Sequence, residues 1–354
     1  MLRWLALLLA VSCVAACTRI GPDTVRHDRF DYNTALADSW KEQILLNIVK
    51  LRYMDTPVFL DVASIVSGYT VESTLSAGGA IFNRDGVVPG VPDSSVTLGA
   101  QGKYTDRPTI TYAPLTGPQF IKSLMTPLPP PSVLFLLQSG YPADAVLPIV
   151  LDALNGLQNR RGAGLRMRAA DPGFYEALDH LRKVQVSGAV EMNIIAKDKQ
   201  ETGLIVLRRR AEAEEESQAL RKLLDLDQDA TEFRVTYGGA ARSRTEIAML
   251  TRSMFAIMVE LASHVQVPER DVIEQRAVPV LADDGSDKHR PIRILSAAAQ
   301  PADAFVAAPY HGQWFYIDDR DLASKRTFTF LMLLFTLANE GPKEGLPVVT
   351  IPAG

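Results

Sequence analysis

The sequence predicts an α+β fold in which amphipathic helices pack on antiparallel sheets with several β-hairpins. Three observations lead to this prediction. Apolar residues recur three or four positions apart in several segments, which is typical of amphipathic helices. Other segments alternate apolar and polar residues, as half-buried strands do, and Gly, Pro, Asn and Asp separate them. Short turns of this kind join antiparallel neighbours, and strands and helices follow one another along the whole chain.

The composition is that of a folded protein. The 354 residues are 47% hydrophobic and 22% charged, which is too apolar for a disordered chain. The length allows one large domain or two ordinary ones, because single cores stop growing near ~250 to 300 residues. With a net charge of -4, the chain is not a nucleic-acid binder that works through overall charge.

Residues 1–16 predict a secretory signal peptide. Arg3 is the only charged residue among them, and residues 4–16 form an apolar run. At about 13 residues this run is shorter than the ~20 that a membrane-spanning helix needs. We therefore expect the segment to be removed from the mature protein.

The signal ends in Val14-Ala15-Ala16-Cys17, which resembles the lipobox of bacterial lipoproteins. The resemblance implies that Cys17 is acylated and becomes the first mature residue. The mature chain then keeps no thiol for a disulfide or a thiolate metal site. Thr18 stands where an Asp would resemble an inner-membrane retention signal, so the resemblance implies an outer-membrane lipid anchor with the body facing the periplasm.

The residues after the anchor predict a tether followed by a helix. Residues 17–32 contain Gly21-Pro22 and alternating charges without apolar periodicity, which favours a lipidated tether. Residues 33–53 carry an apolar stripe with spacings of four and three, which predicts an amphipathic helix. We expect the members of this stripe in the core: Leu36, Trp40, Ile44, Ile48 and Leu51.

Two alternating segments predict a long hairpin within residues 69–112. Residues 71–81 and 96–105 each place apolar and polar residues on opposite faces, and a Gly-, Pro- and Ser-rich loop joins them. Residues 109–113 predict a third strand. The favoured interpretation is a half-buried hairpin of a soluble sheet, since antiparallel sheets often have one wet face. The alternative is a hairpin that several protomers each contribute to a pore, because ~10 residues suit a tilted membrane-crossing strand.

We expect an N-terminal α+β region at 33–170 and a C-terminal α+β region at 171–354. The composition turns rich in Arg and Gly before a new helix start at Asp171-Pro172. Before this boundary, residues 132–138 and 143–157 predict helices.

The C-terminal region begins with the order helix, strand, strand, helix, strand, helix. The corresponding segments are 171–184, 191–196, 204–207, 211–226, 233–237 and 243–265. The last helix is expected because Ser243 and Glu246 resemble a capping box.

Two hairpins, a helix and a final strand follow. The first hairpin pairs 278–281 with 292–295, and the second pairs 305–310 with 314–317 around His311-Gly312. A helix capped by Asp321 or Ser324 and a strand at 348–351 complete the chain.

The search for catalytic and metal-binding motifs yields no site. Among the five His, His311 is expected in a turn and His264 at a helix C-terminus. The best metal candidate is the acidic turn of Asp283, Asp284 and Asp287, which lacks EF-hand spacing and suits a solvated turn better. We therefore assign no catalytic, cofactor-binding or metal-binding residue and expect no cofactor.

One basic cluster is left open. Arg160, Arg161, Arg166 and Arg168 surround Gly162-Ala163-Gly164. They could bind an anionic envelope polymer through charge-assisted hydrogen bonds, or form a soluble linker.

These observations favour a nonenzymatic scaffold or interaction subunit of an envelope complex, anchored in the outer membrane by acyl chains. Its expected partners are the membrane and envelope proteins, without nucleic acid. One alternative is an oligomeric pore or secretion-channel component that uses the 69–112 hairpin. Another is an envelope-polymer hydrolase with no recognisable motif.

Overall fold

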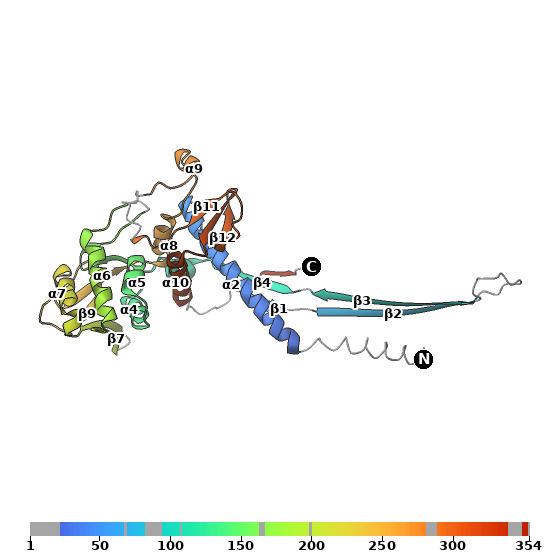
Figure 1. The fold of residues 1–354 in the computed structure, drawn as a ribbon, viewed down its shortest axis with the longest axis horizontal. Helices are drawn as coiled ribbons and strands as arrows, with labels where there is room; N and C mark the ends of the chain where they lie inside the picture. Colours follow the sequence, from blue (N-terminus) through green and yellow to red (C-terminus); the bar gives the residue numbers. More distant parts are fainter. Residues whose placement is uncertain are drawn as a thin grey trace. The chain divides into compact units, whose positions relative to one another are not determined.

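The computed structural model describes residues 22–66, 69–81, 94–106, 108–162, 167–197, 200–280, 289–338 and 349–352. It confirms the α+β fold, with helices packed on largely antiparallel sheets (Figure 1). Contacts divide the chain into two compact units. We call Met1–Val58 with Thr116–Gly341 the body, and Phe59–Leu115 with Pro342–Gly354 the ribbon unit. The predicted signal peptide and Cys17 lie outside the described residues.

The body begins with α2, a helix over Pro22–Arg52. It starts within the predicted tether, where Pro22 suits the first turn of a helix because proline lacks the N–H that would stay unpaired there. The core prediction for Trp40 is wrong, since this side chain is 38% exposed. The fully buried face of α2 starts only at Ile44, because helical periodicity shows which residues share a face but not how far along the helix that face is covered.

A mixed six-stranded sheet forms the centre of the body. Its strand order is β6-β5-β10-β9-β8-β7. The bounds are β5 Leu151–Leu154, β6 Leu157–Gln158, β7 Val190–Lys197, β8 Gln200–Leu207, β9 Glu232–Tyr237 and β10 Glu246–Thr251. The β9/β10 pair is parallel and the other pairs are antiparallel. The sheet thus joins strands from both sides of residue 170.

Helices cover this sheet and extend the core. They are α3 Pro118–Met125, α4 Pro130–Gln138, α5 Ala143–Val150, α6 Pro172–Val186, the 3-10 turn Ala211–Ala213, α7 Glu214–Leu223, α8 Met254–Ala262, α9 Glu269–Ile273 and α10 Leu322–Ala338. Helix α4 packs so closely on β8 that a Cβ at Gly203 would lie 2.3 Å from Leu134 Cδ1. Glycine at this position therefore lets the helix approach the sheet. Leu134, Leu147 and Phe174 are among the largest fully buried side chains.

Two predicted helices are partly strands. Residues 151–154 form β5 rather than the second half of a helix, and residues 246–251 form β10 rather than the start of one. Both strands are largely buried on both faces, so they lack the alternation that marks a half-exposed strand. The true cap of α8 is Ser253, whose hydroxyl accepts a hydrogen bond from the Ala256 N–H at 3.2 Å.

The last part of the body is a three-stranded sheet of order β11-β13-β12, with β11 Leu295–Ala297, β12 Ala304–Tyr310 and β13 Gln313–Asp318. The turn at His311-Gly312 is confirmed, and both residues have positive φ, as a two-residue hairpin turn requires. The hairpin predicted for 278–281 and 292–295 is wrong in its described part. Residues 278–280 are not in a strand, while Ile294 bridges to Val265 and β11 pairs with β13.

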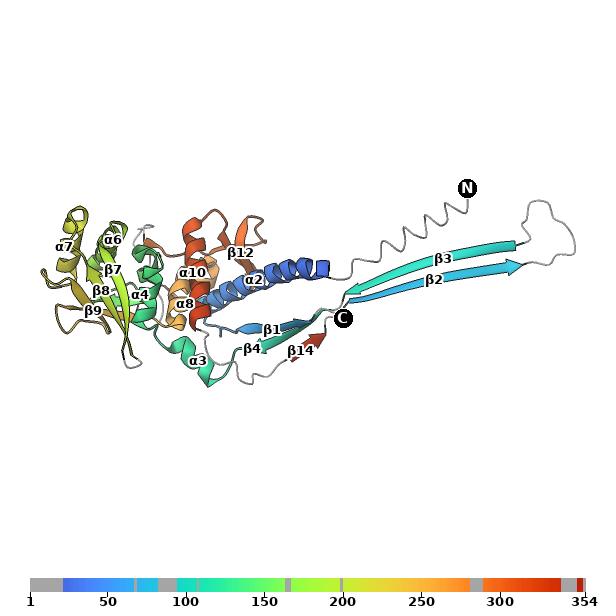
Figure 2. The ribbon, with the colours of Figure 1, turned by 90° about the horizontal axis from the view of Figure 1, so that it is seen from below.

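The ribbon unit contains two antiparallel sheets. Strands β1 Leu60–Val66, β4 Thr109–Pro114 and β14 Val349–Pro352 form a sheet of order β1-β4-β14. Strands β2 Tyr69–Ile81 and β3 Ser94–Asp106 pair only with each other among the described residues. The predicted hairpin is therefore confirmed, with strands of 13 residues that run side by side along their whole length (Figures 1 and 2). We call β2 and β3 together the ribbon.

Candidate functional site

The ribbon continues the pairing of the strands that lead into it. Val66 lies opposite Thr109 in the β1/β4 pair, and Tyr69 lies opposite Asp106 in the β2/β3 pair, so the register is the same in both. One register shift occurs earlier, between Val62 and Ser64. The described pairs from Ser64 to Ile81 therefore share one antiparallel register.

This register sorts the residues of the ribbon by charge. Residues directly opposite each other share a face, and strand alternation places every second residue there. One face holds Val71, Ser73, Leu75, Ala77, Gly79 and Ile81 opposite Tyr104, Gly102, Ala100, Leu98, Val96 and Ser94, and none of these is charged. The other face holds Glu72 opposite Lys103 and Thr74 opposite Gln101, and these four side chains are exposed.

The ribbon is the least self-sufficient part of the described structure. A two-stranded hairpin is marginally stable by itself in water, and no third strand among the described residues pairs with the backbone N–H and C=O groups of either long edge. Its internal side-chain support includes a weak hydrogen bond from the Ser76 hydroxyl to the Gly99 carbonyl at 3.3 Å. The ribbon is therefore our candidate interaction surface.

The body contains a buried charge cluster around Asp152. Arg161 Nη2 lies 2.5 Å from Asp152 Oδ2, and Arg168 Nη2 lies 3.1 Å from Oδ1. Arg252 is only 4% exposed, and its Nε lies 3.7 Å from the same carboxylate. Its guanidinium also donates to the carbonyls of Pro148, Ile149 and Arg160. Burial lowers the pKa of Arg252.

A second carboxylate, Glu260, engages Arg160. Arg160 Nη1 lies 2.9 Å from Glu260 Oε1, and the backbone N–H of Gly162 donates to Oε2 at 2.8 Å. A Cβ at Gly162 would lie 2.4 Å from Ser263 Oγ, so the backbone approaches this closely only as glycine. The described arginines of the basic cluster, whose role the sequence leaves open, thus contact Asp152, Glu260 and backbone carbonyls. Arg166 lies outside the described residues.

Two tyrosine–carboxylate pairs lie where α2 ends. The Tyr53 hydroxyl donates to Asp271 Oδ2 at 2.7 Å, and the Tyr310 hydroxyl donates to Asp55 Oδ2 at 2.9 Å. Burial and the Asp55 contact raise the pKa of Tyr310 to about 12, and burial and the Asp271 contact also raise the pKa of Tyr53. Both phenols therefore stay protonated near neutral pH, which suits a structural role and not that of a general base.

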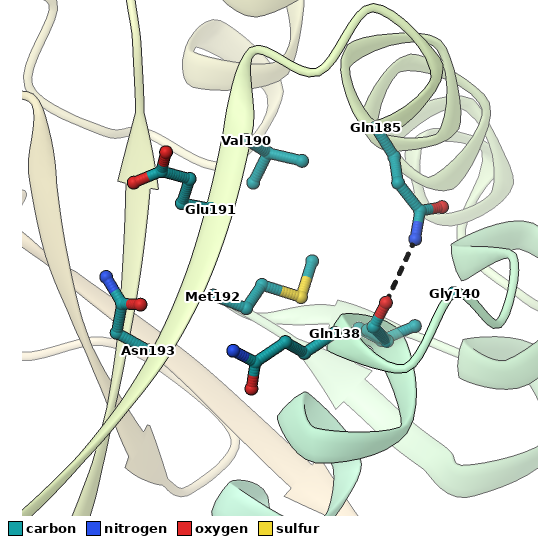
Figure 3. A pocket seen from close by; sticks show the side chains of 8 residues that line it. Gln138, Gly140, Gln185, Val190, Glu191, Met192 and Asn193 are labelled. Atoms are coloured by element: carbon teal, nitrogen blue, oxygen red, sulfur yellow. Dashed lines mark hydrogen bonds between the residues drawn. The ribbon is translucent and has the colours of Figure 1, made fainter.

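A cavity of about 430 Å³ lies between α4, α6 and β7. In Figure 3 the side chains of Val190 and Met192 point toward the two helices, whereas those of Glu191 and Asn193 point away. Glu191 is the only carboxylate in the lining, and it pairs with Arg208 at 2.8 Å. Gln185 donates to the carbonyls of Leu137 and Tyr141. The cavity thus lacks a pair of groups for acid–base catalysis.

Most of the remaining sequence predictions concern residues that the structure does not describe. Cys17 and the acidic turn of Asp283, Asp284 and Asp287 lie outside the described residues. Within the described ranges, no group of His, Cys, Asp and Glu side chains could hold a metal ion. His264 follows α8 as predicted, and its Nε2 lies 3.3 Å from Arg160 Nη1.

Sequence reasoning found the ribbon but missed the partners of the arginine cluster. Asp152 and Glu260 carry no local signal, because their contacts join residues up to a hundred positions apart.

None of the described helices combines the length and the hydropathy that a membrane span needs. Comparisons with family models, curated proteins and solved structures find no match to this chain.

Proposed function

We propose that the chain is a nonenzymatic lipoprotein, anchored in the outer membrane through acylated Cys17, whose periplasmic body carries the ribbon as an interaction element of an envelope assembly. The observation that carries this proposal is the ribbon itself. Strands β2 and β3 are 13 residues long, yet no third strand among the described residues pairs with either. Strand edges of this length usually have a partner or a protective device.

The body supports a structural role in the same assembly. One buried group of charges, Asp152 with Arg161, Arg168 and Arg252, is paired internally. The cavity between α4, α6 and β7 has no second acidic or basic side chain beside Glu191 in its lining. This cavity therefore gives the hydrolase alternative no support.

The lipid anchor is tested with one cysteine variant and a matched control. Cells that produce the wild type, Cys17→Ser or Cys13→Ser are labelled with radioactive palmitate. We expect incorporation in the wild type and in Cys13→Ser, because residue 13 lies in the signal peptide, and none in Cys17→Ser. Equal labelling of Cys17→Ser and wild type would exclude the lipoprotein assignment.

The interaction role is tested by removing the ribbon. Val66 and Thr109 lie opposite each other, so an Asn-Gly turn can replace residues 67–108 and keep the rest of the β1/β4 pair. We expect envelope proteins crosslinked to the wild type in cells to be lost from this variant, while its lipidation persists. Unchanged crosslinks, or reproducible turnover of peptidoglycan by the purified protein, would count against the proposal.

A further inference from the structure

We propose that neighbouring copies of this chain pair through their ribbons, with β3 of one copy beside β2 of the next, and that the uncharged face of the resulting sheet meets the hydrocarbon of the outer membrane. This inference rests on the proposed function, since the lipid anchors would hold the copies on one membrane. It names the partner of the ribbon as further copies of the same chain.

The two edges of the ribbon are complementary to each other. Strand β2 runs toward the tip and β3 runs back, so copies that point the same way place β3 of one antiparallel to β2 of the next. Such a contact uses a different surface on each side, and its repetition closes into a ring when the rotation fits. Each new pair would satisfy up to 13 residues of otherwise unpaired edge.

The charges of the ribbon fit the same arrangement. Glu72 and Lys103 lie directly opposite each other and are both exposed. In a row of equivalent copies, Lys103 of one copy therefore lies beside Glu72 of the next at nearly the same height. Opposite charges alternate along the row, which favours this neighbour over a β2/β2 contact that would bring two Glu72 carboxylates together.

The uncharged face has the length that a bilayer requires and carries no charge over that length. Residues 71–81 and 94–104 carry no charge on this face, and Asp106 marks its end opposite Tyr69. At ~3.3 Å per residue, residues 71–81 extend about 36 Å, and a tilt near 40° reduces this to about 28 Å across the membrane. That distance is close to the ~30 Å hydrocarbon core. Tyr69 and Tyr104 lie at the base, where aromatic residues mark the interface of membrane strands.

The neighbour relation is tested by disulfide formation between two differently tagged copies in the same cells. One copy carries Glu72→Cys and the other carries Gln101→Cys, Lys103→Cys or Thr105→Cys. Because mature Cys17 is acylated in the proposed function, the introduced thiols report without interference. We expect mixed dimers for at least one of these three partners. We expect none for Thr97→Cys, because residue 97 lies about 20 Å from Lys103 along β3.

Copies that all carry Glu72→Cys serve as the matched control, since β2 does not neighbour β2 in the proposed row. Their expected yield of dimers is at least tenfold lower than the best mixed pair. Equal yields in the control and the mixed pairs would overturn the arrangement. Absence of all mixed dimers would also overturn it, and if ribbon-dependent crosslinks to other envelope proteins persisted, the proposed function would stand without self-pairing.

The membrane contact is tested with a fluorophore on a single cysteine in vesicles that contain brominated lipids. Ala100→Cys reports the uncharged face, and Gln101→Cys, its neighbour in sequence, reports the other face. We expect at least threefold stronger quenching by the brominated lipid at position 100 than at position 101. Equal quenching, or strong quenching of position 100 by aqueous iodide, would overturn the lipid contact and leave that face to a protein partner.

Discussion

The body and the ribbon of this chain obtain their stability in different ways. In the body, helices cover the six-stranded sheet, and large side chains such as Phe174 and Leu147 are fully buried. In the ribbon, two strands of 13 residues pair with each other and with no further strand in the described ranges. The body thus has a buried core, whereas a two-stranded hairpin is marginally stable by itself in water.

The two regions also treat charge differently. The body buries Asp152 and Arg252 and surrounds them with donors and acceptors. The ribbon keeps Glu72 and Lys103 exposed on one face, and between residues 71–81 and 94–104 it has no charge on the other. Substitutions of charged or apolar residues should therefore be costly in the body and nearly silent in the isolated ribbon.

The largest effect is expected at the buried charge cluster. Asp152→Ala leaves Arg252, Arg161 and Arg168 without their shared carboxylate. Breaking a buried ion pair costs about 3–5 kcal/mol, because a desolvated charge remains. We expect the free energy of unfolding of the purified protein, measured by urea titration, to fall by about this amount.

The matched control removes a carboxylate from an exposed pair. Glu191→Ala breaks a contact with Arg208 in which both side chains are about half exposed. Such surface pairs contribute about 0.2–1 kcal/mol. If Asp152→Ala cost no more than Glu191→Ala, the cluster would not be the buried structural element described here.

A comparison of two leucines separates the regions directly. Leu147 in α5 is fully buried, so Leu147→Ala is expected to cost about 2–5 kcal/mol through lost contacts and a residual cavity. Leu75 lies opposite Ala100 in the two-stranded ribbon. In the monomeric protein, Leu75→Ala should shift the midpoint of the main thermal transition by less than about 1 °C. A marginally stable hairpin contributes little to the stability that this transition measures. A large shift for Leu75→Ala would favour the half-buried soluble hairpin instead.

The ribbon was predictable from sequence because apolar and polar residues alternate between Val71 and Ile81, as they do in a strand whose two faces differ in polarity. Strand β10 was not, since Ile247, Ala248 and Met249 are all buried and such a run resembles a helix. The prediction that Trp40 lies in the core was wrong, because helical spacing does not show how much of the helix length packs against other elements. The charge cluster required the fold itself, which brings Asp152 to Arg252.

An effect of intermediate size is expected at alkaline pH. The pKa of Tyr310 is raised to about 12 and that of Tyr53 is also raised, whereas an unfolded tyrosine titrates near ~10. The folded state thus keeps protons that the unfolded state loses, so the contribution of Tyr310 is complete below about pH 10 and is lost between about pH 10 and 12. The contribution of Tyr53 is lost only at still higher pH.

The double variant Tyr53→Phe/Tyr310→Phe tests this dependence. Each substitution should cost about 1 kcal/mol at pH 8, the usual net value of one hydrogen bond. The decline of the unfolding free energy above pH 10 should then be shallower than in the wild type, because the two phenols no longer titrate. Parallel declines in both proteins would show that the two hydroxyl contacts do not stabilise the body.

The smallest effect on the body is expected from the largest change in the chain. Replacing residues 67–108 with Asn-Gly removes the ribbon and keeps Val66 opposite Thr109 across a two-residue turn. The body and the ribbon unit are separate compact units, so the core around Leu147 and Phe174 stays intact. We expect the free energy of unfolding, measured by urea titration and followed by the fluorescence of Trp40 and Trp314, to change by less than about 1 kcal/mol. The Asp152→Ala variant shows in the same assay that a real loss is detected. A decrease of more than about 2 kcal/mol on ribbon removal, well beyond the ±10–15% extrapolation error of such titrations, would mean that the ribbon shares in the body's stability, and the division of labour between the two regions would be wrong.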